Sequence, residues 1–117
     1  MKTTVINKQN SHKYTWGPGC ESFVFLDTEG LSVKHEVMPP AAKENLHYHN
    51  ESKQLFYMLK GEAAFYIDDE TVLVKQGESV YIAPKQKHYI KNDSAATIEF
   101  LVISQPSTHE DRVDSET

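Results

Sequence analysis

Residues 46–68, LHYHNESKQLFYMLKGEAAFYID, contain three short apolar runs separated by polar turns. Aromatic and β-branched runs of this length, bounded by Gly, Asn and Asp, are typical of strands joined by hairpins. The pattern recurs along the chain, with candidate strands at 22–27, 31–38, 46–49, 53–59, 62–68, 71–75, 79–83, 87–92 and 96–104. Helical periodicity is weak throughout. The sequence therefore predicts an all-β fold, an antiparallel sandwich or barrel.

Length and composition limit the class of protein. A chain of 117 residues, 38% hydrophobic and 25% charged, fits one globular domain with one small core. The net charge of −5, with Lys and Arg scattered along the chain, disfavours a nucleic-acid partner. No segment has the roughly 20 apolar residues of a membrane span, and none resembles a secretion signal. Because the single cysteine, Cys20, cannot form an intramolecular disulfide, we expect a cytoplasmic protein.

Three histidines are candidate metal ligands. His47 and His49 are two residues apart, so in a strand both imidazoles project from the same face. Gln54 opens the next predicted strand, and His88 begins a later one. Imidazoles from different strands that converge inside a small barrel suit a first-row divalent metal. The HxH pair alone is a weak signal, but Gln54, the following Gly61 and the third histidine make the pattern more specific.

With these residues the chain resembles the cupins, and in particular the small single-domain bacterial members of that family. Their two motifs are usually written G-x5-HxH-x3–4-E-x6-G and G-x5-PxG-x2-H-x3-N. The corresponding positions here are Ala41, His47, His49, Gln54 and Gly61, then Gly77, Ala83, Lys85, His88 and Asn92. The spacings match over about residues 20–104, while Ala41, Gln54, Ala83 and Lys85 depart from the pattern.

The resemblance implies a jelly-roll barrel that holds one divalent transition metal, Fe, Mn, Ni or Zn. Its ligands would be His47, His49, His88 and the residue at position 54, where Gln54 replaces the family's glutamate. Three neutral imidazoles and an amide leave the charge of the metal uncompensated, which favours an anionic ligand such as a carboxylate, enolate or catecholate. Gln54 is either a direct ligand or a hydrogen-bond donor to a bound water or substrate.

Other side chains are candidates for the lining of the pocket. Strand alternation places five apolar residues in the barrel interior, as core or as pocket wall: Phe56, Met58, Phe65, Ile90 and Phe100. His35 shares a face with Leu31, Val33 and Val37. A histidine on an apolar face is usually a core or interface residue, and a place in the pocket lining is the alternative.

Three further residues have open roles. Trp16 and Cys20 flank a Gly-Pro-Gly turn, which is either a turn with a packing tryptophan or a lid over the barrel mouth. Cys20 has no evident activating partner, so we do not expect a thiol nucleophile. Arg112, the only arginine, is either solvated or positioned to cap an anionic substrate.

We expect one cupin domain over residues 1–117, with a barrel core at about 20–104. An N-terminal arm (1–19) would precede the core, and a polar, partly disordered tail (105–117) would follow it. The predicted strand at 53–59 is apolar on both faces, so its outer face needs a cover, and we expect a homodimer.

The resemblance implies a metal-dependent enzyme that acts on a small anionic organic molecule, either as a dioxygenase-like oxidoreductase or as an isomerase. No buried carboxylate base is evident near the histidines, since Glu51 lies in a turn and Glu62 follows Gly61. That absence favours oxygen chemistry or simple binding over proton transfer. The alternative from another class is a non-enzymatic barrel that binds a small molecule or a sugar.

Overall fold

The computed structural model describes residues 3–116, so the first two residues of the predicted arm and the last of the tail lie outside it. Over this range the chain forms strands and turns and contains no helix. The strands are β1 (His12–Trp16), β2 (Cys20–Asp27), β3 (Ser32–Met38), β4 (His47–His49), β5 (Lys53–Lys60), β6 (Ala63–Ile67), β7 (Glu70–Val74), β8 (Ser79–Ile82), β9 (His88–Lys91), β10 (Ile98–Gln105) and β11 (Arg112–Asp114). Residues 3–116 include no helix able to cross a membrane.

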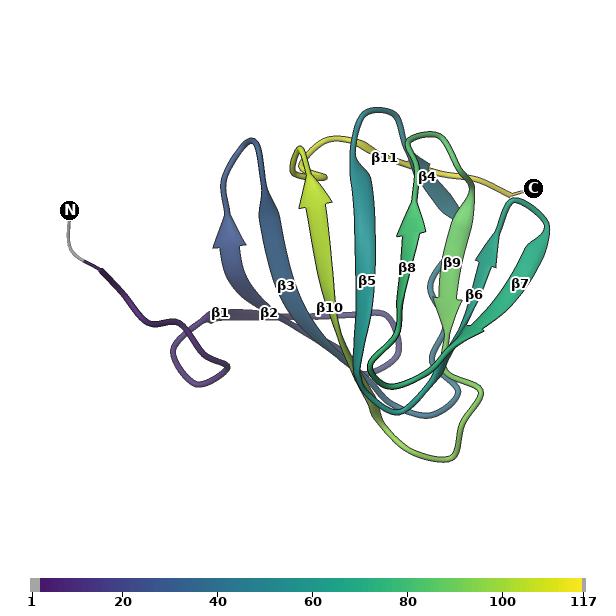
Figure 1. Ribbon diagram of the computed structural model, residues 1–117, viewed down its shortest axis with the longest axis horizontal. Coiled ribbons are helices and arrows are strands. Elements are labelled where there is room, and N and C mark those ends of the chain that lie inside the picture. Colours follow the sequence, from purple (N-terminus) through teal and green to yellow (C-terminus); the bar gives the residue numbers. More distant parts are fainter. Residues whose placement is uncertain (1–2, 117) are drawn as a thin grey trace.

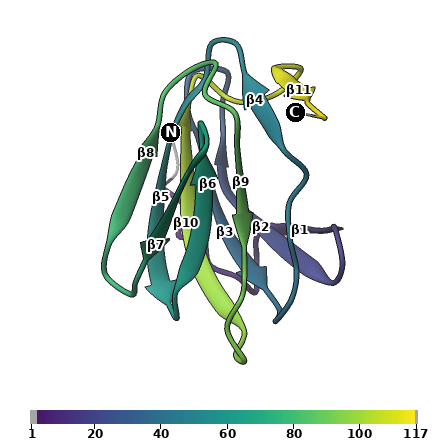
Figure 2. The same ribbon diagram turned by 90° about the vertical axis from the view of Figure 1, so that its right-hand side faces the viewer.

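The strands form two antiparallel sheets that pack as layers. One sheet has six strands in the order β1-β2-β3-β10-β5-β8, and the other has five in the order β11-β4-β9-β6-β7. In Figure 2, β6, β7 and β9 of the smaller sheet lie in front of β5, β10 and β3 of the larger one. This arrangement confirms the predicted all-β jelly-roll sandwich.

The core lies between the two sheets and follows from period-two alternation. Along β5, Phe56 and Met58 are buried, while Leu55, Tyr57 and Leu59 are each more than one third exposed. The ring of Phe56 contacts those of Phe65 and Phe100, with centroids 5.1 Å and 5.8 Å apart, and so joins the two layers. Burial of these apolar side chains is the main favourable term in the stability of such a sandwich.

Two turns adopt the left-handed conformation without glycine. Ala41 has φ of 68° and Lys85 has φ of 71°, and both occupy positions where the family motif has glycine. Hydrogen bonds hold each turn in place: the Ala41 amide donates to the Asn92 carbonyl at 2.9 Å, and the Lys85 amide donates to the His49 carbonyl at 2.6 Å. The turns therefore keep their form although the side chains strain the backbone.

Both ends of the described chain contribute strands that the sequence did not predict. The N-terminal segment lies apart from the body of the protein and leads toward it, and β1 then pairs with β2, with Trp16 opposite Cys20 (Figure 1). The expectation of a partly disordered tail is wrong for residues 112–114, because β11 pairs with β4 and places Arg112 opposite His49. This order comes from backbone pairing, which a short polar segment does not reveal in its side-chain pattern.

Candidate metal centre

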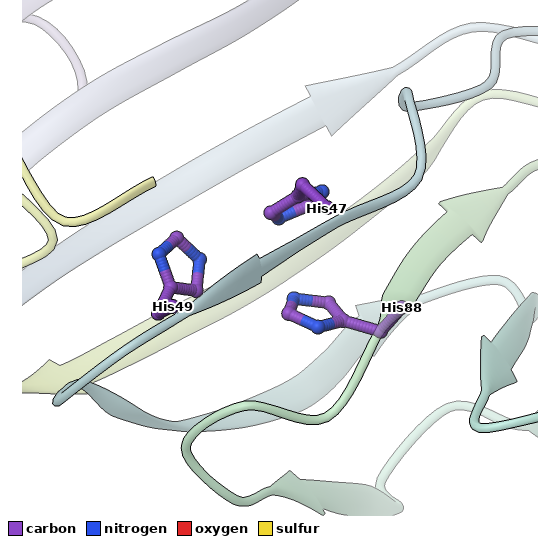
Figure 3. A group of neighbouring side chains, drawn as sticks. All are labelled: His47, His49 and His88. Carbon is purple, nitrogen blue, oxygen red and sulfur yellow. The ribbon is translucent and has the colours of Figure 1, made fainter. Parts of the chain in front are cut away.

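Three imidazoles converge between the sheets. Strand β4 places His47 and His49 on the same face, and His47 is the register partner of His88 on β9. All three are 4% exposed or less. Their ligand nitrogens lie within 4.8 Å of one another, and Figure 3 shows the rings turned toward a common space.

One ring nitrogen of each histidine is fixed by a backbone carbonyl. Nδ1 of His47 donates to the Asn45 carbonyl at 2.7 Å. Nδ1 of His49 donates to the Asp111 carbonyl, and Nδ1 of His88 donates to the Gln86 carbonyl, both at 2.8 Å. A carbonyl only accepts, so Nδ1 carries the proton and Nε2 keeps its lone pair. Within residues 3–116, the buried Nε2 atoms of His49 and His88 have no hydrogen-bond partner.

The surroundings keep the imidazoles neutral. Burial lowers the pKa of His47 to about 3 and that of His88 to about 4, and it lowers the pKa of His49 in the same direction. Neutral imidazoles with free Nε2 lone pairs are the form in which histidine binds a metal. The arrangement is compatible with a divalent metal site.

Gln54 adds an oxygen to this group. Its amide nitrogen donates to the Ser104 hydroxyl at 3.0 Å, which leaves the amide oxygen directed elsewhere. That oxygen is buried and, among the described residues, has no hydrogen-bond partner. Gln54 lines the same cavity as His47 and His49.

The cavity beside the histidines has a volume of about 240 Å³. Trp16 and Tyr14 line it from β1, so this strand forms part of the cavity wall. A wider surface depression of about 780 Å³ elsewhere is lined largely by acidic and polar residues and contains none of the three histidines.

Two carboxyl groups line the cavity, one buried and one partly buried, contrary to the expectation that no buried carboxylate lies near the histidines. Buried Glu36 belongs to the inner face of β3, and Glu44, whose side chain is 13% exposed, precedes β4. Burial, together with the nearby charge of Glu36, raises the pKa of Glu44 to about 8, against the opposing effect of Arg112. Burial also raises the pKa of Glu36, although Ser22, Lys34 and Trp16 oppose that shift.

Two cationic side chains line the same cavity. The Lys34 ammonium donates to the Tyr14 hydroxyl at 2.9 Å and so links β3 to β1. Arg112 donates from Nε to Asp114 at 2.9 Å, and its Nη1 lies 4.0 Å from an oxygen of Glu44. The tail thus brings Arg112, the only arginine of the chain, to the wall of the cavity, where its side chain remains 42% exposed.

The predicted lining residues separate into three groups. Phe56 lines the cavity, whereas the others of the apolar set, Met58, Phe65, Ile90 and Phe100, are buried in the core. Contrary to the prediction, His35 does not line the cavity. It lies on the outer face of the larger sheet, where Nε2 is 2.8 Å from Glu99 and the ring meets the edges of Phe23 and Phe25.

The error at His35 has a simple origin. The face of β3 that carries His35, Val33 and Val37 is the more apolar one, which is the usual sign of an inner face, but the cavity is lined by the polar face with Lys34 and Glu36.

Cys20 is fully buried, and burial together with the charges of Glu36 and Glu44 raises the pKa of its thiol to about 11. A thiol with this pKa is not a nucleophile at neutral pH.

The chain belongs to the cupin family, whose Cupin domain description matches residues 34–104, more than half of the chain. It is 35% identical over 81 residues to an uncharacterised protein of Methanocaldococcus jannaschii, covering 68% of this chain and 65% of that one. It is 29% identical over 66 residues to an oxalate-binding protein of Thermotoga maritima, covering 56% and 54%. The chain thus spans less than two thirds of these curated relatives.

Solved structures agree with the fold. The crystal structure of a predicted oxalate decarboxylase from Thermotoga maritima superposes with a TM-score of 0.81 at 19% identity, covering 89% of this chain and all of that one. At this identity the likeness establishes the fold alone.

Proposed function

We propose that the chain binds one divalent transition metal, Fe, Mn, Ni or Zn, through His47, His49, His88 and the amide oxygen of Gln54. The observation that carries this proposal is the convergence of three neutral imidazoles, each with Nδ1 fixed by a carbonyl and Nε2 left for a ligand. The unpartnered oxygen of Gln54 supports it as the fourth donor. Hydrogen bonds from the far ring nitrogen to a carbonyl orient metal-binding histidines and raise their basicity.

We propose further that the protein is a metal-dependent enzyme acting on a small carboxylate. A bound divalent metal would supply Lewis-acid polarisation of a coordinated oxygen. None of the four donors carries a negative charge, so an anionic ligand would balance the charge of the metal. Lys34 and Arg112 add positive charge to the same cavity. A relative whose name records oxalate binding supports this ligand class.

The two carboxyl groups of the cavity wall favour isomerase-like proton transfer over dioxygenase-like chemistry. Glu36 and Glu44 line the same cavity as His47 and His49, and a carboxyl group with a raised pKa can hold a proton at neutral pH and release it. Dioxygen cleavage needs a redox metal with open positions but no such pair. Glu44 is oriented by the Ile90 amide, which donates to its Oε1 at 3.2 Å.

Metal content by mass spectrometry on protein purified without a histidine tag tests the metal site. The wild-type protein is expected to hold close to one equivalent of metal and His47→Ala far less. His109→Ala is the matched control, because that side chain is 85% exposed and does not line the cavity that contains His47 and His49. Wild-type protein that stays metal-free after incubation with each of the four metals would refute the site.

Enzyme and binder are distinguished on the manganese-loaded protein. An enzyme needs a coordination position that exchanges water and accepts the substrate, so water proton relaxation should be enhanced by the bound ion and should fall when a carboxylate is added. A closed, unresponsive site would favour the non-enzymatic binding barrel.

A further inference from the structure

The cavity combines features that suit an anion with two groups that repel one. Lys34, Arg112 and the proposed metal site attract a carboxylate, whereas buried Glu36 and partly buried Glu44 add two carboxyl groups to the same wall. A buried carboxylate is costly unless hydrogen-bond donors surround it. A ligand that carries only carboxylates would bring more negative charge and no donor.

The protein supplies too few donors for these carboxyl groups. Glu44 accepts one hydrogen bond, from the Ile90 amide at 3.2 Å, and the Arg112 guanidinium stays 4.0 Å from its other oxygen. Ser22 and Trp16 lie close enough to Glu36 to lower its pKa. However, neither the Ser22 hydroxyl nor the Trp16 indole nitrogen is within hydrogen-bonding geometry of any described residue. Both glutamates thus retain capacity for a ligand.

Two of the proposed metal donors face this cavity, so a bound metal would lie beside the glutamates. His49 is 4% exposed and Gln54 is 7% exposed, and both line the cavity. The Nε2 atom of His49 and the Oε1 atom of Gln54 have no hydrogen-bond partner within residues 3–116. Buried polar atoms without partners are rare in folded proteins unless a ligand, ion or water satisfies them.

We infer that the ligand is a small hydroxy acid, a carboxylate that also carries hydroxyl groups, and that Glu36 and Glu44 form hydrogen bonds with these hydroxyl groups. This inference deepens the proposed function and rests on it for the place of the carboxylate. A hydroxyl both donates and accepts, so it matches a glutamate in either protonation state. The cavity of about 240 Å³ corresponds to about eight waters, the size of an acid with roughly four to six carbons.

Three four-carbon dicarboxylates test this inference: succinate, L-malate and L-tartrate, which share chain length and charge and differ in the number of hydroxyls. Calorimetric titration of the zinc-loaded protein is expected to give about tenfold tighter binding of malate than of succinate, the value of one hydrogen bond to a charged group. Tartrate should bind at least as tightly as malate. Equal affinity for succinate and malate, or no binding of any of the three, would overturn the inference.

Variants show which group reads the hydroxyl, because a metal can also chelate a hydroxy acid. The preference for malate should disappear in Glu36→Leu and weaken in Glu44→Gln, where the amide can still accept from Ile90. Glu62 is exposed and lies outside the cavity, so the Glu62→Gln variant should keep the preference for malate. A preference that survives in both Glu36→Leu and Glu44→Gln would assign the hydroxyl to the metal and refute the inference.

Metal content, measured on the same samples, separates the two proposals. A protein that holds zinc but does not distinguish malate from succinate keeps the metal site and loses the hydroxy-acid inference. A protein that fails to hold zinc but still prefers malate, with the preference lost in Glu36→Leu, keeps the inference and loses the metal site.

Discussion

The backbone carbonyl of Asp111 accepts a hydrogen bond from Nδ1 of His49 at 2.8 Å, so the C-terminal tail orients one of the three convergent imidazoles. The carboxylate of the same residue accepts hydrogen bonds from the amides of Asn50, Glu51 and Ser52 at 2.9, 3.1 and 2.9 Å. Asp111 therefore fixes both His49 and the turn that leads to Gln54. The tail, 59 or more residues away in sequence from that turn, completes the site.

Asp111→Ala is expected to weaken metal binding by about 10-fold or more, because the three amides of the turn after His49 lose their carboxylate acceptor. The tail that carries the carbonyl partner of His49 is then no longer held against this turn. Competition for zinc against a chromophoric chelator measures the effect. Asp93→Ala is the control, since Asp93 is exposed and pairs only with Lys91 at the surface. Equal zinc affinity in wild-type and Asp111→Ala protein would mean that the tail does not support the site.

The sequence predicted the histidine cluster because its geometry is local. Two residues in a strand separate side chains on one face, so His47 and His49 needed only the strand assignment, and the spacing pattern of the family supplied His88. The core residues Phe56 and Met58 followed from the same alternation. These predictions depend on the alternation of side chains along a strand, which the structure retains in β4 and β5.

The remaining parts of the site depend on contacts that no local pattern carries. Glu36 was not predicted to line the cavity, because the cavity is lined by the polar face of β3 and not by its apolar face. Glu44 lies in a segment outside the predicted strands, and its position relative to Glu36 is set by tertiary packing. Arg112 reaches the cavity through the pairing of β11 with β4, which joins segments about sixty residues apart. A buried polar cavity wall looks like a solvent-exposed strand face in sequence.

Glycine at positions 41 and 85 is expected to stabilise the protein. Ala41 and Lys85 hold left-handed φ values of 68° and 71°, a conformation that costs a residue with a Cβ about 1 kcal/mol and glycine almost nothing. Ala41→Gly and Lys85→Gly should each raise the free energy of unfolding by about 0.5 kcal/mol after the entropic cost of glycine. Urea denaturation measures this change, with Ala64→Gly, within β6, as a control that should destabilise. Destabilisation by all three would contradict the strain at these turns.

The metal-free protein is expected to be most stable near pH 6.5. Burial lowers the pKa of His47 from 6.5 to about 3 and that of His88 to about 4. Below pH 6.5 the unfolded chain thus binds more protons, and the free energy of unfolding falls by up to about 1.4 kcal/mol per pH unit for each histidine. Burial raises the pKa of Glu44 from 4.5 to about 8, so above pH 6.5 the folded chain binds more protons and stability falls as the pH rises.

Denaturation in the presence of a chelator at pH 4.5, 6.5 and 8 measures this profile. Between pH 6.5 and 4.5 the three histidines, whose pKa values are all lowered, outweigh the opposing effect of Glu36 and Glu44, whose pKa values are raised. Glu44→Gln should weaken the decline on the alkaline side and steepen the decline on the acid side, because the opposing effect of Glu44 is removed there. A free energy of unfolding that does not change across this range would show that these groups titrate alike in the folded and unfolded chains.

The outer face of the larger sheet is expected to bind a second copy of the chain, as the proposed homodimer requires. Leu55, Tyr57 and Tyr81 are 37%, 38% and 53% exposed, and Leu55 and Tyr81 are register partners on neighbouring strands. An apolar strip of this kind favours association. Sedimentation velocity should give a dimer for the wild type and a monomer for Leu55→Lys with Tyr81→Lys. Leu73→Lys, an exposed leucine on the other sheet, should stay dimeric, and a monomeric wild type would refute the interface.

Gln54→Glu is expected to bind zinc more tightly but to lower the stability of the metal-free protein. A carboxylate at this 7%-exposed position would cancel one unit of metal charge, yet without metal it would be a buried charge facing the Ser104 hydroxyl. Thermal unfolding should therefore show a larger zinc-induced rise in Tm for Gln54→Glu than for the wild type. Gln54→Leu removes the oxygen proposed to bind the metal, so it should reduce the zinc-induced rise in Tm. If all three proteins respond equally to zinc, residue 54 is not a metal ligand.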